Sequence, residues 1–381
     1  MIEVLRQVGF FPHTCVWELT LACNLRCKHC GSRAGKRRAQ ELSLDECLRV
    51  AGELVELGCQ HITLIGGEAT LFPGWHEVAR RLVDLGAQVN MITNGVTWST
   101  EHLDRAKAAG LCAVSFSLDG FEHEHDHFRA PGSFARIVRA IDLNVAASLQ
   151  TGINTTINRL NQGQLKEMRP FLIEHGVSGW QLQLATVAGN MEEHLDLVSA
   201  PEDLLWLVPQ IAELCRMNSP EFEIYVGHNI GYFGNAESDL RAADVELPFW
   251  LGCRAGCQVI GIESGGDVKG CLALPSSVHR ERRFVEGNLR EESLRDIWNR
   301  ADAFAYNRLF QETQLCGFCP VCRFRDVCRG GCAWASYAQR GRGNEQCFYY
   351  QAVKHQRFEL LAESPTTEEM VFFRNPERPT E

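Results

Sequence analysis

The decisive stretch of this chain is residues 16–30, VWELTLACNLRCKHC. Its first five residues form a largely apolar run that predicts a β-strand. Three cysteines follow at once in the spacing C-x3-C-x2-C, at Cys23, Cys27 and Cys30. Iron–sulfur clusters usually take four cysteine thiolates, so three on one loop would leave one iron open to a small ligand. Two other interpretations of these cysteines are a zinc site completed by His29 and a chance grouping.

Outward from this loop, short apolar runs alternate with amphipathic segments as far as Leu214. This rhythm is typical of repeated βα units and predicts a parallel sheet. The first helix is expected after Ser43, which has capping-box spacing to Glu46, and should stop at Gly58. Strands are predicted at 16–20, 61–65, 88–93, 112–118, 150–156 and 180–184, and further helices at about 74–85, 100–109, 133–147, 163–175 and 201–215. Six units are too few for an eight-unit barrel, so we predict an α/β fold with a partial (β/α)6 barrel whose ligands lie at the C-terminal ends of its strands.

Cysteine usage changes sharply near residue 250. Nine of the 17 cysteines lie between Cys253 and Cys347, in a loop-rich region where metal is expected to replace part of an apolar core. The residues from about Ser364 onward predict a frayed tail. The expected domains are an N-terminal segment (1–15), the barrel (16–218), a linker (219–250), a cysteine-rich domain (251–350), and a C-terminal helix and tail (351–381).

Composition bounds the kind of protein. With 45% hydrophobic and 23% charged residues the chain should form a packed core, and a net charge of −10 argues against a general nucleic-acid binder. No apolar run reaches the roughly 18 residues of a membrane-spanning helix, and the N-terminus lacks a signal-peptide stretch. We therefore expect a cytoplasmic protein with no membrane partner, in which dense cysteine indicates metal rather than disulfides.

Three more motifs follow the next three strands: Gly66-Gly67-Glu68, Thr93-Asn94-Gly95 and Ser117-Leu118-Asp119-Gly120. Together with the cysteine loop, their order and spacing resemble the radical SAM superfamily over most of residues 16–215. The resemblance implies a [4Fe-4S] cluster on the three cysteines, with S-adenosylmethionine (SAM) on its open iron. It also implies reductive cleavage of SAM to methionine and a 5′-deoxyadenosyl radical, which abstracts hydrogen from a substrate.

The same resemblance suggests which residues contact SAM. Glycines 66 and 67 would let backbone carbonyls approach the SAM amine, with Glu68 in support. The other candidate SAM contacts are Asn94, Ser117, Asp119 and Asn154, of which the last three could instead be turn formers. No catalytic side chain can be chosen from the sequence.

The segment FEHEHDHFRAPGSF, residues 121–134, crowds His123, His125 and His127 together. Because it is bounded by glycine and proline, we expect a loop with solvated histidines rather than a metal site. For Arg129 we expect a structural role or a role in the SAM loop.

The C-terminal cysteines resemble the SPASM extension of some radical SAM enzymes. Their spacings are Cys253-x3-Cys257, Gly266-x4-Cys271, Cys319-x2-Cys322-x5-Cys328-x3-Cys332, and then Cys347. The resemblance implies two auxiliary [4Fe-4S] clusters, cluster I on Cys253, Cys257, Cys271 and Cys332 and cluster II on Cys319, Cys322, Cys328 and Cys347. Without Cys257, cluster I would keep an open site for substrate, and Cys316 is a spare or alternative ligand. A pair of zinc knuckles is the other interpretation.

SPASM-bearing enzymes mostly modify peptides, so the resemblance implies a maturase that forms a thioether or carbon–carbon crosslink in a ribosomally made precursor peptide or protein. A reductase, flavodoxin or ferredoxin is the expected electron donor. About fifteen residues precede the first strand, too few for a winged-helix peptide-recognition domain, so a separate peptide-recognition protein is a further expected partner. The alternatives are the same chemistry on a small-molecule cofactor or tetrapyrrole precursor, and a non-catalytic metal-binding scaffold.

Overall fold

The computed structural model describes residues 5, 7, 9–243, 249–276, 284–338 and 343–374. Its strands are β1 (Thr14–Glu18), β2 (His61–Ile65), β3 (Gln88–Thr93), β4 (Ala113–Ser117), β5 (Gln150–Ile157), β6 (Gly179–Leu184), β7 (Glu223–Val226), β8 (Val259–Ile262), β9 (Asp267–Lys269) and β10 (Gly287–Asn288). Its helices are α2 (Leu44–Glu56), α3 (Trp75–Asp84), α4 (Thr100–Ala109), α5 (Glu122–Phe128), α6 (Ser133–Ala146), α7 (Leu165–Glu174), α8 (Leu204–Cys215), α9 (Glu237–Leu240), α10 (Leu294–Asn299), α11 (Ala305–Arg308), α12 (Arg325–Cys328), α13 (Ala333–Ala338), α14 (Phe348–Lys354) and α15 (Thr367–Arg374).

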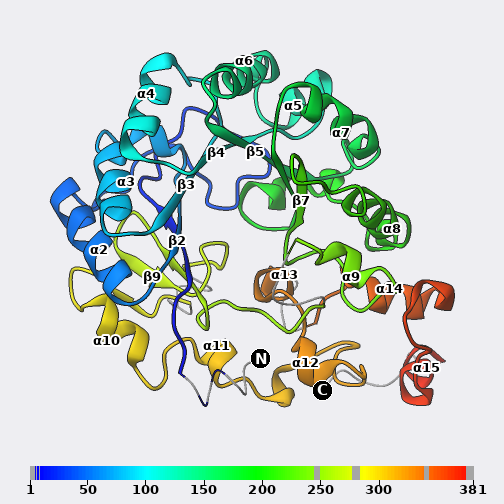
Figure 1. The fold of residues 1–381 in the computed structure, drawn as a ribbon. Coiled ribbons are helices and arrows are strands. Elements are labelled where there is room, and N and C mark those ends of the chain that lie inside the picture. Colours follow the sequence, from blue (N-terminus) through cyan, green and yellow to red (C-terminus); the bar gives the residue numbers. More distant parts are fainter. Residues whose placement is uncertain are drawn as a thin grey trace.

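All ten strands belong to one sheet, in the order β10-β9-β8-β1-β2-β3-β4-β5-β6-β7. The strands from β8 through β7 pair in parallel, whereas β9 and β10 are antiparallel. The sheet curves, and helices α2 to α8 form an arc outside it (Figure 1). The predicted α/β fold with a parallel sheet is therefore confirmed, and the six predicted strands are β1 to β6.

The sheet is longer than the six predicted strands. β7 comes from the predicted linker and pairs with β6, while β8 comes from the predicted cysteine-rich domain and pairs with β1, Val16 opposite Gly261. A Cβ added to Gly261 would lie 2.8 Å from the amide nitrogen of Leu272, so a side chain has no room there. The sheet thus crosses two predicted domain boundaries, and the C-terminal region is an extension of the barrel wall.

Helix α2 starts as its sequence predicts. Ser43 Oγ accepts a hydrogen bond from Glu46 N (3.3 Å), and Glu46 Oε2 accepts one from Ser43 N (2.7 Å). This reciprocal capping box satisfies two amides that the first turn would otherwise leave unpaired. The helix then buries Cys47, Val50 and Leu54 against the sheet.

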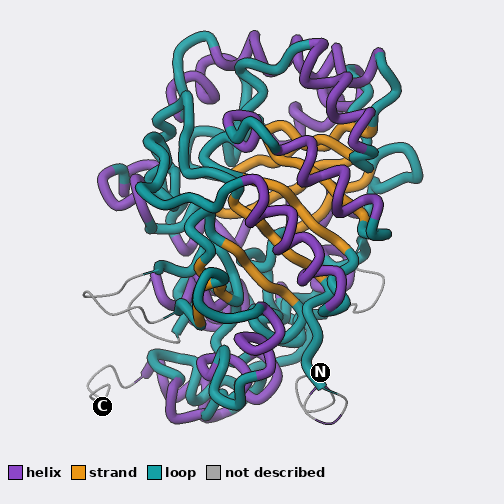
Figure 2. Tube along the Cα trace, turned by 90° about the vertical axis from the view of Figure 1, so that its left-hand side faces the viewer, coloured by secondary structure: helices purple, strands orange, loops and turns teal. Residues whose placement is uncertain are grey.

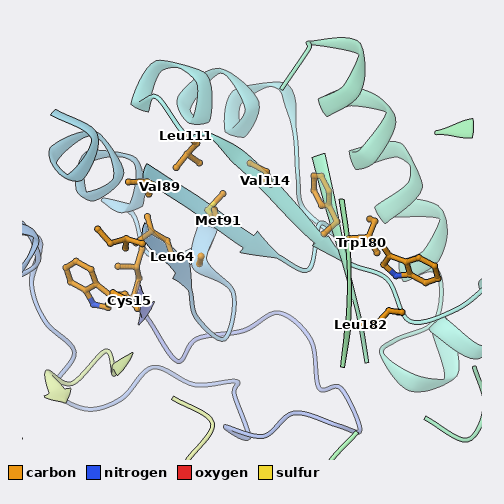
Figure 3. Close-up of a cluster of buried hydrophobic side chains, with 14 of the residues drawn as sticks. Cys15, Leu64, Val89, Met91, Leu111, Val114, Trp180 and Leu182 are labelled. Carbon is orange, nitrogen blue, oxygen red and sulfur yellow. The ribbon is translucent and has the colours of Figure 1, made fainter. Parts of the chain in front are cut away.

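The core of the barrel lies between the sheet and its outer helices. Alternate strand residues such as Leu64, Met91, Val114 and Trp180 are buried there in one continuous apolar cluster (Figure 3). Because successive strand side chains point to opposite faces, the residues between them line the inside of the barrel. These inner positions are often polar and half-buried, for example Asn90 on β3.

The described part of the chain after β10 consists of short helices and loops and lies below the barrel (Figure 2). Its last described element, α15, corrects the prediction of a tail frayed from about residue 364. The Glu369 carboxylate is fully buried and accepts hydrogen bonds from Tyr349 Oη (3.1 Å) and Arg323 N (2.9 Å), which fix α15 in place. Residues 375–381 of the predicted tail lie outside the described residues. None of the described helices is long and apolar enough to cross a membrane.

Candidate metal centres

The three cysteines of the first motif lie on the loop that follows β1. Backbone amides are aimed at two of their sulfurs, from Leu25 N to Cys23 Sγ (3.4 Å) and from Ala34 N to Cys30 Sγ (3.2 Å). Burial raises the pKa of the Cys27 thiol to about 11 and also raises that of Cys23. These thiols therefore need a bound cation to be thiolates at neutral pH, while the amides suit negatively charged sulfur.

A short 3₁₀ segment after β6, Gly189–Glu193, holds this cysteine loop from the opposite side of the barrel. Asn190 donates from its backbone nitrogen to Cys30 O (3.0 Å) and from Nδ2 to Cys27 O (2.9 Å). Gly189 has φ of +59°, and a Cβ there would lie 2.3 Å from Cys30 O. Sequence reasoning missed both residues, because their roles depend on a contact across about 160 positions that no local pattern indicates.

The two glycines after β2 pack against the chain just before Cys23. A Cβ on Gly66 would lie 2.7 Å from Thr20 O, and one on Gly67 would lie 2.5 Å from Leu21 O. Gly67 N also donates to Thr20 O (2.7 Å). This close approach is a structural reason for both glycines that the sequence hypothesis did not include, and their contact with SAM stays a prediction.

Glu68 joins the ends of two strands to the cysteine loop. Its carboxylate is buried and accepts from Thr93 Oγ1 (2.7 Å) and Asn94 N (2.8 Å) at the end of β3. The Asn94 side chain in turn donates from Nδ2 to Asn24 Oδ1 (2.7 Å) and lies 3.9 Å from Cys23 Sγ. The predicted SAM residues Glu68 and Asn94 therefore hold the first cysteine in position.

Asp119 and Arg129 place a positive charge beside Cys27. The fully buried Asp119 accepts from Thr156 N (2.7 Å) and from Arg129 Nε (2.5 Å), and Arg129 Nη1 lies 4.0 Å from Cys27 Sγ. Burial alone would raise the pKa of Asp119, but the guanidinium beside it holds that pKa below its usual value. Arg129 is thus oriented by a carboxylate toward the cysteine loop, which fits the structural role expected for it.

The histidine-rich segment is not the solvated loop that the sequence predicted. It forms helix α5, in which His125 is fully buried and its Nδ1 accepts a hydrogen bond from Asp119 N (3.1 Å). Burial lowers the pKa of His125 to about 4, so the ring is neutral. His123 and His127 are exposed, as expected.

Ser117 and Asn154 lie side by side on β4 and β5, and the same row continues to Gln181 on β6 and Tyr225 on β7. In-register side chains of parallel strands point to one face, here the inside of the barrel. The side chains of Ser117 and Asn154 make no hydrogen bond to other described residues. They are therefore available to a bound molecule, and Gln181 is a further candidate that only the strand register shows.

All four cysteines assigned to cluster II line one cavity of about 160 Å³. Cys316, left as a spare ligand, lines it as well. Asn344 donates a backbone hydrogen bond to Cys319, and its side-chain nitrogen is buried without a partner among the described residues. Four cysteines that line one cavity are the donor set that an iron–sulfur cluster requires, so the residues fit the group.

Three of the four cysteines assigned to cluster I are neighbours. Cys253 and Cys271 pack around the same apolar side chains. Burial raises the pKa of Cys332, and the nearby charges of Cys253 and Cys271 raise it further. Cys257 is 1% exposed and packs instead with Leu5. Cys257 as a ligand stays a prediction, and its surroundings differ from those of the other three.

The described residues contain no group of three or more His, Cys, Asp or Glu side chains that could hold a single metal ion. Each thiolate of a four-iron cluster binds its own iron, so cluster ligands need not converge on one point. The structure combines a partial parallel barrel, a three-cysteine loop at the C-terminal end of its first strand and a cysteine-lined cavity. This combination defines an iron–sulfur enzyme of the α/β class.

Comparison with known proteins identifies the family. The radical SAM superfamily model matches residues 17–171, and the model of the SPASM iron–sulfur cluster-binding domain matches residues 253–323. The mycofactocin maturase MftC of Mycobacterium ulcerans is 31% identical over 333 residues, covering 86% of this chain and 84% of the relative. This chain belongs to the radical SAM superfamily and carries a SPASM domain.

Two other similarities bear on function and fold. The AdoMet-dependent heme synthase of Methanosarcina barkeri is 29% identical over 357 residues, covering 90% of this chain and 98% of the relative. The crystal structure of Streptococcus suis SuiB bound to S-adenosylmethionine superposes with a TM-score of 0.69 at 18% identity, covering 90% of this chain and 78% of SuiB. The chain is therefore a radical SAM enzyme, whose cofactors are SAM, a [4Fe-4S] cluster and auxiliary clusters.

Proposed function

We propose that this enzyme is a maturase that abstracts hydrogen from a ribosomally synthesised peptide or protein and forms a thioether or carbon–carbon crosslink. The observation that carries the proposal is the 31% identity to a mycofactocin maturase, which extends over 86% of the chain. SuiB, with the same fold, has been crystallised with its precursor peptide SuiA.

Cys23, Cys27 and Cys30 would hold the SAM-binding cluster. When bound and reduced, that cluster supplies the electron that cleaves SAM to a carbon radical. Arg129, oriented by Asp119, adds positive charge beside Cys27, and the row Ser117, Asn154 and Gln181 offers hydrogen-bonding groups to SAM or substrate. The 3₁₀ segment at 189–193 and the loop after β2 hold the cysteine loop through hydrogen bonds and close backbone contacts.

The interior of the barrel favours a peptide over a tetrapyrrole. The heme synthase relative matches over 98% of its own length, which makes a tetrapyrrole the second candidate substrate. Tetrapyrroles carry several carboxylates, which proteins usually pair with Arg or Lys. Strands β2 to β6 contain neither residue type, whereas their inner-facing serine, asparagine and glutamine side chains suit the amides of a peptide.

The partners follow from the chemistry. Three clusters require an external electron donor, which we propose to be a reductase, flavodoxin or ferredoxin, and a separate protein would recognise the precursor peptide. Reduced cysteines and oxygen-sensitive clusters suit the cytoplasm.

The test is anaerobic reconstitution with iron and sulfide, reduction in the presence of SAM, and measurement of 5′-deoxyadenosine by mass spectrometry. We expect product from the wild type and from Cys112→Ala, which removes an exposed cysteine outside every predicted cluster, but none from Cys27→Ala. A short peptide encoded beside the gene should then lose two hydrogens. Conversion of an iron tetrapyrrole with no change in the peptide would identify the heme-type activity instead, and iron-free, SAM-inert protein would indicate a scaffold.

A further inference from the structure

Tyr306, on the short helix α11, carries a buried polar group that the fold does not explain. Its hydroxyl has no hydrogen-bond partner among the described residues. The ring packs edge-on against Phe284, with centroids 5.3 Å apart and planes at 90°, and it lies near Tyr337. Burying a hydroxyl without a partner is unfavourable, and phenylalanine would fill the same space without that cost.

The surroundings of this hydroxyl belong to the proposed cluster I site. Cys253, Cys271 and Tyr306 pack around the same apolar residues. A Cβ added to Gly270 would lie 2.2 Å from Tyr306 Oη, so the hydroxyl lies against the backbone immediately before Cys271.

Helix α11 is also fixed to the loop that carries Cys253. Asn307, next to Tyr306, donates from Nδ2 to Cys253 O (2.6 Å) and to Ala255 O (2.8 Å). The next residue, Arg308, donates from Nε to Gly256 O (2.6 Å). These contacts leave the Tyr306 ring little freedom to move away from the cysteines.

We propose that, when auxiliary cluster I is bound, the Tyr306 hydroxyl donates a hydrogen bond to a thiolate sulfur of that cluster, on Cys253 or Cys271, and thereby raises its reduction potential. The inference rests on the proposed ligands of cluster I. A tyrosine hydroxyl keeps its proton at neutral pH and can donate to sulfur. Reduction adds negative charge to a cluster, so a donor to its sulfurs stabilises the reduced form more than the oxidised form. Tyr306 would then adjust the reduction potential at which cluster I transfers electrons.

The experiment is a redox titration of anaerobically reconstituted enzyme, followed by electron paramagnetic resonance, for the wild type, Tyr306→Phe and Tyr337→Phe. Cys332→Ala identifies the signal of cluster I by removing it. In Tyr306→Phe we expect unchanged iron content and a negative shift of the cluster I midpoint alone. Tyr337→Phe, which removes a hydroxyl from the same group of rings, should leave all midpoints unchanged.

The other outcomes overturn one idea or the other. Unshifted potentials in Tyr306→Phe with full iron would overturn the hydrogen bond, and loss of about a third of the iron would show that Tyr306 is a ligand instead. The proposed ligand assignment of cluster I would be overturned if the wild type binds about eight rather than about 12 iron atoms, or if Cys332→Ala loses no iron.

Discussion

In the barrel, strands β1 to β6 bury alternate side chains in one continuous apolar cluster, which also includes side chains of β8 and α10 from the C-terminal region. The apolar side chains around the cluster II cavity, by contrast, form a small separate group. The barrel strands are also joined by regular backbone hydrogen bonds, while residues 316–338 and 343–347 consist of turns and short helices around a cysteine-lined cavity. The barrel can therefore be stable through burial of apolar surface, whereas the chain around the cluster II cavity has to gain much of its stability from bound iron. The two regions should therefore respond differently when bound iron is removed or when buried groups of the barrel are changed.

The largest expected effect is that of iron removal. Without iron, buried thiols around the cluster II cavity lose the bonds that hold their loops together. Hydrogen–deuterium exchange should then rise strongly across the described parts of residues 316–361 and remain low in β2 to β5. Equal increases in both regions would show that the barrel depends on iron as well.

The second prediction compares two cysteines of the C-terminal region, Cys328 and Cys257. Cys328→Ala removes a predicted cluster II ligand and should lower the iron content from about 12 to about eight atoms per chain. Cys257→Ala tests whether cluster I keeps an open site for substrate, in which case the iron content stays unchanged because Cys257, packed with Leu5, is not a ligand. If Cys257→Ala also loses about four iron atoms, Cys257 is the fourth ligand of cluster I.

The smallest effect concerns pH and lies in the barrel. The pKa of His125 is lowered from 6.5 to about 4 by burial, so the unfolded state binds the proton more readily than the folded state. The contribution of His125 to stability is therefore complete above about pH 6.5 and is lost as the pH falls toward 4, by about 2 kcal/mol between pH 7 and pH 5.

The variant His125→Asn keeps an acceptor for Asp119 N but cannot titrate in this range. Urea unfolding followed by circular dichroism at pH 7 and pH 5 should show a smaller loss of stability in the variant than in the wild type. Equal losses in the two proteins would mean that other groups account for the acid sensitivity of the barrel.

The sequence predicted those parts of the fold that depend on nearby residues. Strands β2 and β3 begin and end where the apolar runs do, and the capping box of Ser43 and Glu46 forms as its spacing indicates. The α5 helix was missed because the burial of His125 depends on Asp119 and on packing outside the segment.

Features that depend on distant contacts could not be read from the sequence. β7 has four residues, of which only Ile224 is buried, so it lacks a clear alternating pattern. The row that extends from Asn154 to Gln181 is visible only in the strand register. The cysteine spacings predict which residues belong to the metal centres, whereas the packing of Cys257 with Leu5 is visible only in the structure.

The pairing of β8 with β1 affects how this enzyme could be re-engineered. An exchange of auxiliary-cluster modules between relatives is an obvious route to new crosslinking activities. Here the incoming module would have to bring its own parallel strand, with a residue as small as Gly261 opposite Val16. In this chain that strand is β8, which pairs with β1, the strand that leads into the cysteine loop. A chimaera joined after β8 keeps the pairing of β8 with β1. A chimaera joined in the predicted linker loses β8, and unless the new module supplies an equivalent strand, β1 becomes an open, aggregation-prone edge strand.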